Sequence, residues 1–275
     1  MTAVRYSPPD EDIRANLGLL KELEGSWYGR GFNLIGRPDK QGAANVYLEL
    51  NVTRESLKFD AIGSPIPNRG FAQNDIELHG LTYLQKISDE QTGGALHIEP
   101  GIWVNIPPTG APSETRSVAR MGSIPHGNAL LASGIAIQVG SGPIINAVNT
   151  APFPEGAPMP AGGTLSAFPA YTIANPATAQ NPRTPFGEAQ GVPLPAEIDG
   201  VPLQDVVNDP TTLLRKAIEG QTIDEMVVLQ IATTNSLNAA AGAVPVENGG
   251  GGIENIAFLD ENADTALVFA TFWIE

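Results

Sequence analysis

Apolar side chains recur at helical spacing near the start of the chain. Four of them share one face of a helix: Ile13, Leu17, Leu20 and Leu23. Positions three or four apart lie on the same side of a helix, so this spacing predicts a short helix over 11–24. Gly25 follows as its stop.

Beyond this helix the apolar positions alternate over short runs rich in β-branched and aromatic residues, which is typical of strands. Two hairpin turns are expected, one at 53–56 and one at 92–94. We predict that the first strand begins at Trp27. Further strands are predicted over 46–52, 57–62, 78–87, 95–106, 117–120, 129–139, 144–148, 223–234, 257–259 and 265–274. About ten short strands with only two helices indicate an all-β, antiparallel barrel.

The second predicted helix covers 209–220. Asp209 precedes it as an N-cap, Pro210 occupies the first helical position, and Gly220 follows its last turn. This helix comes directly after a long stretch of different composition.

That stretch, 143–208, is rich in proline and poor in charge. With Pro210 included it holds about half of the 24 prolines, and Glu155 is the only acidic or basic residue between 121 and 182. Proline disfavours a central strand, while scarce charge and spaced aromatics argue against disorder. We therefore expect one domain over 1–275, with 143–208 as an ordered excursion packed on the barrel wall. A lid over the mouth of the barrel is the alternative.

The net charge of the chain limits the classes of molecule that it is expected to bind. The chain of 275 residues has 15 basic and 30 acidic residues, a net charge of −15. Nucleic acids and anionic membranes attract clustered Lys and Arg, so neither is expected as a partner. Cys is absent, which excludes disulfides and Cys-ligated metal. No run has the length of a signal-peptide core or a spanning helix, and a cytoplasmic location is expected.

Two segments of the first half resemble a known family. The segment GSWYGRG (25–31) follows an amphipathic helix and resembles the Gly-x-Trp-x-Gly-x-Gly signature of nitrobindin-like proteins. The segment LHIEPGIW (96–103) resembles their Met-His-x-Glu-x-Gly-Phe strand. The resemblance covers roughly 15–105 and the last strand. It implies a calycin-type, lipocalin-like barrel shared with the fatty-acid-binding proteins.

Such barrels keep a cavity, so the resemblance implies binding of a small hydrophobic molecule. It also implies that Trp27 closes the barrel floor. The candidate ligand-binding residues are Tyr83, His97, Glu99, Trp103 and Phe269. We expect this binding to be non-catalytic.

Heme is a further possibility that the family raises, because nitrobindins hold iron through a His of the C-terminal strand. This chain has no His after His126. Iron needs an axial His, Cys, Met or Tyr donor, and the predicted last strand has none of them. Heme held in that manner is disfavoured, and a heme-binding protein remains an alternative.

An enzyme is the other alternative. His97 and Glu99 are two residues apart on a predicted strand and therefore share one face. On an inner face they could act as an acid–base pair for isomerisation, cyclisation or hydration. On an outer face they would be solvated. No pair of His residues has the spacing of a zincin site, and no metal is expected.

The last predicted strand is apolar on both faces. Phe269 belongs to the face shared by Leu267, Thr271 and Trp273, and the opposite face carries Phe272. Burial on both sides is expected, with one face on the cavity and the other under the helix or the excursion. A homodimer interface would give the same pattern.

Overall fold

A computed structural model describes residues 10–38, 46–69, 74–109, 116–124, 128–147, 196–233 and 268–275. The main strands are β1 (Gly25–Pro38), β2 (Val46–Ala61), β3 (Ile66–Asn68), β4 (Ile76–Asp89), β5 (Ala95–Asn105), β6 (Val118–Ile124), β7 (Asn128–Val139), β10 (Met226–Ala232) and β11 (Phe269–Ile274). The helices of this part of the chain are too short to span a membrane.

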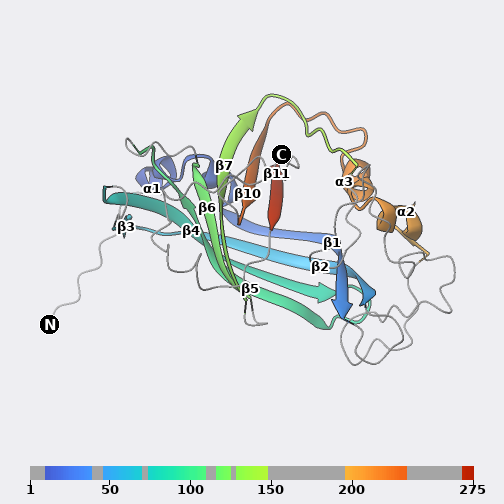
Figure 1. Cartoon of the computed structure of the whole chain (residues 1–275). Helices are drawn as coiled ribbons and strands as arrows, with labels where there is room; N and C mark the ends of the chain where they lie inside the picture. Colours follow the sequence, from blue (N-terminus) through green and yellow to red (C-terminus); the bar gives the residue numbers. More distant parts are fainter. Residues whose placement is uncertain are drawn as a thin grey trace, which may run out of the picture.

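The strands form one antiparallel meander. Its spatial order is β1-β2-β4-β5-β6-β7-β10-β11, and β3 pairs with the beginning of β4 outside this path. The sheet curls through 257° into a half-barrel. Figure 1 shows β1, β2, β4 and β5 running side by side, with β7, β10 and β11 steeply inclined to them beyond β6. The prediction of an all-β antiparallel barrel is therefore confirmed.

The first helix is broken, so the prediction of a continuous helix over 11–24 is wrong. An α-helix, α1 (Asp10–Asn16), is followed by a 3₁₀ helix, η1 (Gly18–Leu23). Gly18 has φ +58°, a left-handed conformation that glycine adopts easily and that ends an α-helix. The break turns Leu17, Leu20 and Leu23 into the core, where each is at most 5% exposed.

The turn predicted at 53–56 is also wrong. β2 is a single strand that pairs without interruption with β1, from Gly25 against Phe59 to Pro38 against Val46. The segment 53–56 contains no Gly, Pro or Asn to make a tight turn, and its polar residues stay in the strand because partners satisfy them. Thr53 Oγ1 donates to Glu55 Oε1 at 2.8 Å. By contrast, the hairpin predicted around 92–94 is confirmed, as β4 pairs with β5.

Other boundaries shift. Residues 144–147 have no regular structure, so the strand predicted over 144–148 is wrong where it is described. β10 is shorter than the predicted 223–234, and β11 begins at Phe269. The predicted strand at 257–259 lies outside the described residues.

The core lies on the face of the sheet that points into the half-barrel, which we call the inner face. It joins η1 to strands from both ends of the meander: Leu17, Leu20, Leu23, Phe59, Leu81, Tyr83, Trp103, Val118, Ala132, Val227, Leu229 and Ile231. The opposite, outer face has a smaller apolar cluster near β3: Leu78, Val104, Ile106 and Ala119. Burial of apolar surface on the inner face thus holds the curled sheet together.

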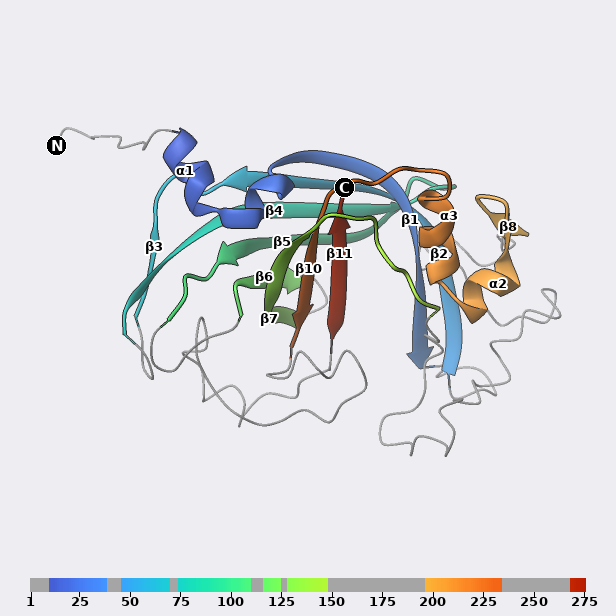
Figure 2. The ribbon, with the colours of Figure 1, turned by 90° about the horizontal axis from the view of Figure 1, so that it is seen from above.

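The segment between β7 and β10 is an insertion, because these two strands are direct neighbours in the sheet. Its described parts contain a small hairpin of β8 (Glu197–Ile198) and β9 (Val201–Pro202), then α2 (Leu203–Asn208) and α3 (Thr211–Ala217). The one helix predicted here, 209–220, is therefore shorter and preceded by a second. Figure 2 shows α2 and α3 at one end of the half-barrel beside β1 and β2, with α1 at the other end. Residues 148–195, most of the predicted excursion, lie outside the described residues.

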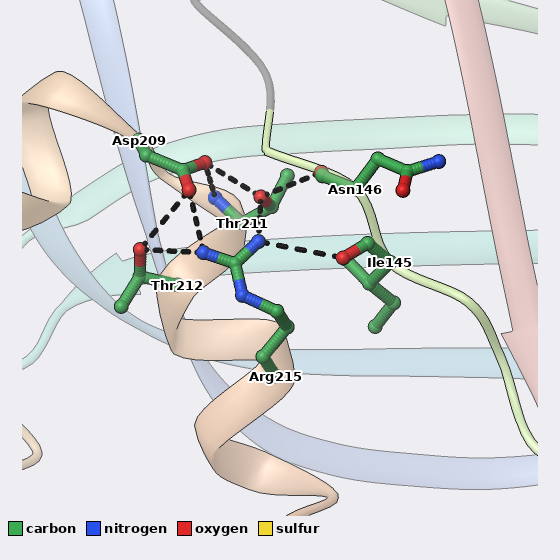
Figure 3. A network of polar contacts seen from close by, with 6 residues as sticks. All are labelled: Ile145, Asn146, Asp209, Thr211, Thr212 and Arg215. Carbon is green, nitrogen blue, oxygen red and sulfur yellow. Dashed lines mark hydrogen bonds and ion pairs between the residues drawn. The ribbon is translucent and has the colours of Figure 1, made fainter.

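A polar network ties the two flanks of this insertion together (Figure 3). Asp209 Oδ1 accepts from the backbone N–H of Thr211 at 3.2 Å. The helix begins at Thr211 with Pro210 at its N-cap, so the predicted N-cap at Asp209 is one residue too early. Arg215 Nη2 donates to Asp209 Oδ2 at 2.5 Å, and its Nη1 donates to the Ile145 carbonyl at 3.4 Å. Thr211 Oγ1 donates to the Asn146 carbonyl at 2.9 Å. The chain therefore leaves β7 and returns towards β10 at a fixed junction.

Replacing Arg215 should weaken this junction. We expect Arg215→Ala to lower the free energy of unfolding by about 1–2 kcal/mol, because Asp209, Thr211 and a carbonyl lose a shared donor. Lys216→Ala is the matched control, since Lys216 is half exposed and its one ion pair within the described part of the chain is with Glu219 at 3.4 Å. Urea unfolding measures both. Equal midpoints for the two variants would contradict a stabilising role for the network.

Candidate functional site

A buried polar cluster lies on the inner face at the middle of the sheet. It takes Tyr83 from β4, Glu99 from β5 and Arg120 from β6. The register pairs Tyr83 with Gly101 and Arg120 with Trp103, so the three polar side chains converge around Gly101. Alternate residues of a strand point to one face, which is why Glu99, Gly101 and Trp103 line up here.

The contacts of the cluster are short and mutual. Arg120 Nη2 donates to Glu99 Oε1 at 2.7 Å, and Arg120 Nε donates to the Tyr83 hydroxyl oxygen at 3.0 Å. The Tyr83 hydroxyl donates in turn to Glu99 Oε1. His97 Nε2 lies 3.3 Å from Glu99 Oε2. Both carboxylate oxygens of Glu99 are therefore engaged.

Burial sets the electrostatics of these groups. Tyr83 is 4% exposed and Glu99 is 5% exposed. Burial acts to raise the pKa of Glu99, but the hydrogen bond from Tyr83, the charge of Arg120 and the contact with His97 together lower it below its usual value. Burial, followed by the hydrogen bond to Glu99, raises the pKa of Tyr83 to about 12. Glu99 is thus ionised and Tyr83 neutral near neutral pH.

Two glycines make room for the cluster. A Cβ atom on Gly101 would lie 2.4 Å from the Tyr83 ring and 2.3 Å from the Met121 carbonyl oxygen. A Cβ atom on Gly122 would lie 2.5 Å from the Tyr83 hydroxyl and 2.6 Å from Glu99 Oε1. Only a residue without a side chain therefore fits at either position while Tyr83 and Glu99 keep their contact.

Aromatic rings surround the Arg120 guanidinium. Its central carbon lies 5.1 Å from the centroid of Tyr83, 5.9 Å from that of Trp103 and 5.7 Å from that of Phe272. Trp103 and Phe272 meet edge to face at 5.3 Å. Cations are stabilised near aromatic faces, and more so when desolvated. Among the described residues, Arg120 Nη1 has no hydrogen-bond acceptor, so its N–H groups remain available beside these rings.

The inner face is not completely filled. Leu57, Leu130, Phe272 and Ile274 pack against the core yet keep part of their surface exposed. A Cβ atom on Gly29, in β1, would meet nothing within 4 Å. Gly29 is exposed, so the inner face is open at this part of β1.

Trp27, expected to close the barrel floor, lies near this open space. It is 42% exposed, and its indole N–H donates to the Leu23 carbonyl at 2.8 Å. Its cross-strand partner is Leu57, on the inner face. Trp27 thus joins the end of η1 to the start of β1 and remains half exposed.

The structure brings four of the five candidate ligand residues together. Tyr83, His97, Glu99 and Trp103 lie on adjacent strands of the inner face. Phe269 does not join them: it pairs with Ala232 on the outer face and is 42% exposed, while Phe272 points inward. A strand with two apolar faces does not reveal which face is internal.

Sequence reasoning missed Arg120, the central residue of the cluster. The only signal was its position as a lone charge in a strand with apolar residues on both sides, Ala119 and Met121. A charged residue in a strand ordinarily points to solvent. The partners that permit its burial come from other strands.

The residues present do not fit heme held in the nitrobindin manner. β11 has no His, Cys, Met or Tyr to act as an axial ligand. His97, the histidine of the cluster, already has Nε2 against Glu99. Within the described ranges, no group of three or more His, Asp and Glu side chains could hold a metal ion.

Comparison with protein-family models, curated proteins and solved structures found no match to this chain. The resemblance to nitrobindin-like proteins therefore stays a prediction.

The glycine that accommodates Tyr83 can be tested directly. We expect Gly101→Ala to lower the free energy of unfolding by about 1–3 kcal/mol, because the new methyl group overlaps the Tyr83 ring and a backbone carbonyl. Gly29→Ala is the matched control in the same sheet, since space is open there. Chemical denaturation of both variants is the measurement. A Gly101→Ala protein as stable as Gly29→Ala would mean that the cluster is not tightly packed.

The phenol of Tyr83 should ionise only at high pH. Its raised pKa means that the folded state favours the neutral phenol: this contribution to stability is complete below about pH 10 and is lost as the pH rises through about 12. We expect the tyrosinate absorbance of the chain, which has five tyrosines, to include a component near pH 12. Tyr83→Phe should remove this component, whereas Tyr28→Phe, at a residue that is 82% exposed, should retain it. Loss of the component in Tyr28→Phe instead would contradict the assignment.

Proposed function

We propose that the half-barrel binds a small, mainly apolar molecule without transforming it, and that the molecule carries a neutral hydrogen-bond acceptor such as a carbonyl. The observation that carries this proposal is Arg120, whose side chain is 13% exposed and lies beside three aromatic rings on a face that is incompletely filled. Its Nη1 has no acceptor among the described residues. Small-molecule sites combine apolar walls with a few placed polar groups. Arg120 supplies the polar group, and Trp103 and Phe272 supply the wall.

Charge balance favours a neutral ligand. The positive charge of Arg120 is compensated by Glu99 at 2.7 Å. A second carboxylate, Glu55, lies further along the same face and accepts from Gln85 Nε2 at 3.3 Å. An anionic ligand would enter beside two carboxylates, and burial of an uncompensated charge is costly. A carbonyl oxygen can accept from Arg120 without that cost.

The positions of His97 and Glu99 suit the enzyme alternative, but the properties of Glu99 do not. His97 and Glu99 are together on the inner face, as an acid–base pair would require. However, the lowered pKa of Glu99 and the engagement of both its oxygens make it a weak proton acceptor. This favours binding over catalysis.

Filling the open space should block the ligand. We expect Gly29→Trp to weaken binding of Nile red, a neutral apolar dye with a carbonyl, by about ten- to a hundredfold through steric exclusion. Dye fluorescence measures the affinity. Gly140→Trp is the control, because Gly140 also has open space around it but lies beyond the end of β7. Absence of binding to the unmodified chain, or equal affinity in the two variants, would contradict the proposal.

A further inference from the structure

The sheet has a hollow lined mainly by residues of its outer face, although His97 of the inner cluster also contributes to the lining. Its volume is about 660 Å³, and it lies over β1, β2, β4 and β5 near the turn that joins β4 to β5. Four of its lining residues form one straight row across these strands: Tyr28, Ser56, Lys86 and Ile98. A hollow of this size is in the range of small-molecule sites, roughly 300–1,000 Å³. Its size limits an occupant to a small molecule.

The row combines an exposed aromatic ring, a cation and an aliphatic side chain. Tyr28 is 82% exposed and Ile98 is 45% exposed, so both offer apolar surface to a ligand. Directly opposed residues in a sheet have Cβ atoms about 4.5–5.5 Å apart. A flat apolar group could therefore contact Tyr28 or Ile98 while remaining within reach of Lys86.

The lining of the hollow includes two cationic side chains, Arg54 and Lys86, although the chain as a whole is strongly acidic. Among the residues that the structure describes, the Lys86 ammonium has no ion-pair partner. Arg54 forms a long ion pair, with its Nε 3.7 Å from Glu90 Oε1. The other oxygen of this carboxylate, Oε2, pairs more closely with Arg30 Nη2, at 2.8 Å. Glu55 contributes to the lining, but its carboxylate is bound by Thr53 and Gln85 on the inner face. The hollow therefore has one cation without a described ion-pair partner, Lys86, and a second, Arg54, whose ion pair is long.

We propose that this hollow is a second binding site, for a small organic anion with a flat apolar body. The anionic group pairs with Lys86, assisted by Arg54, and the apolar body lies against Tyr28 and Ile98. The site differs from the inner one in charge: Arg120 is neutralised by Glu99, whereas Lys86 is not. The two faces of one sheet therefore select ligands of different charge.

The test uses 2-naphthoate and its neutral analogue 2-naphthamide, with binding to the full chain measured by calorimetry. We expect 2-naphthoate to bind better than 2-naphthamide. Lys86→Gln should lower the affinity for 2-naphthoate about three- to fivefold, as expected for a partly exposed charge pair. The affinity for 2-naphthamide should not change. Tyr28→Ala should weaken both compounds by about two- to tenfold. Lys58→Gln, at another exposed lysine that already pairs with Asp60 at 2.8 Å, is the control.

Three results would overturn the proposal: no binding of 2-naphthoate, equal affinity for the acid and the amide, or equal effects of Lys86→Gln and Lys58→Gln. Binding that is abolished by Gly29→Trp and unaffected by Lys86→Gln would place the anion on the inner face and would also overturn it. Because Lys86 and Tyr28 are both exposed, their variants should fold, and circular dichroism checks this.

Discussion

The interior of this protein depends on the ion pair between Arg120 and Glu99. Burying either charge alone would cost several kcal/mol, but a close partner and additional hydrogen bonds offset that cost. Tyr83 and His97 provide these bonds, and Gly101 and Gly122 leave the space for them. Three strands must therefore adopt one register for the pair to form. The pair specifies how β4, β5 and β6 align as much as it stabilises them.

The same cluster determines what the inner face can offer a ligand. An arginine that is already neutralised presents hydrogen-bond donors without a net charge, and the rings of Trp103 and Phe272 exclude water from one side of it. The outer face of the same strands presents Lys86, a cation without a described partner. Alternation of side chains along a strand is what allows one sheet to carry both environments.

The insertion between β7 and β10 shows how a long segment can be added to a simple meander. β7 and β10 remain paired as neighbours, so the inserted residues do not disturb the sheet. The network around Arg215 holds the two flanks at one junction, and Arg30 of β1 contacts Asp199 at 3.2 Å. The described part of the insertion is thus attached to β1 and to the segment that follows β7.

The sequence by itself determined the strand-rich antiparallel class, the hairpin of β4 and β5, and the shared face of His97 and Glu99, because these follow from local periodicity and turn residues. It also indicated that a helical segment ends near Leu23 and that the first strand begins near Trp27. It did not determine that 53–56 stays extended, that Gly18 breaks the first helix, or that Phe272 rather than Phe269 points inward. Those outcomes, and the burial of Arg120, depend on partners from distant strands. Only the tertiary structure decides them, because the free energy of a buried charge or an apolar face is set by what lies opposite it.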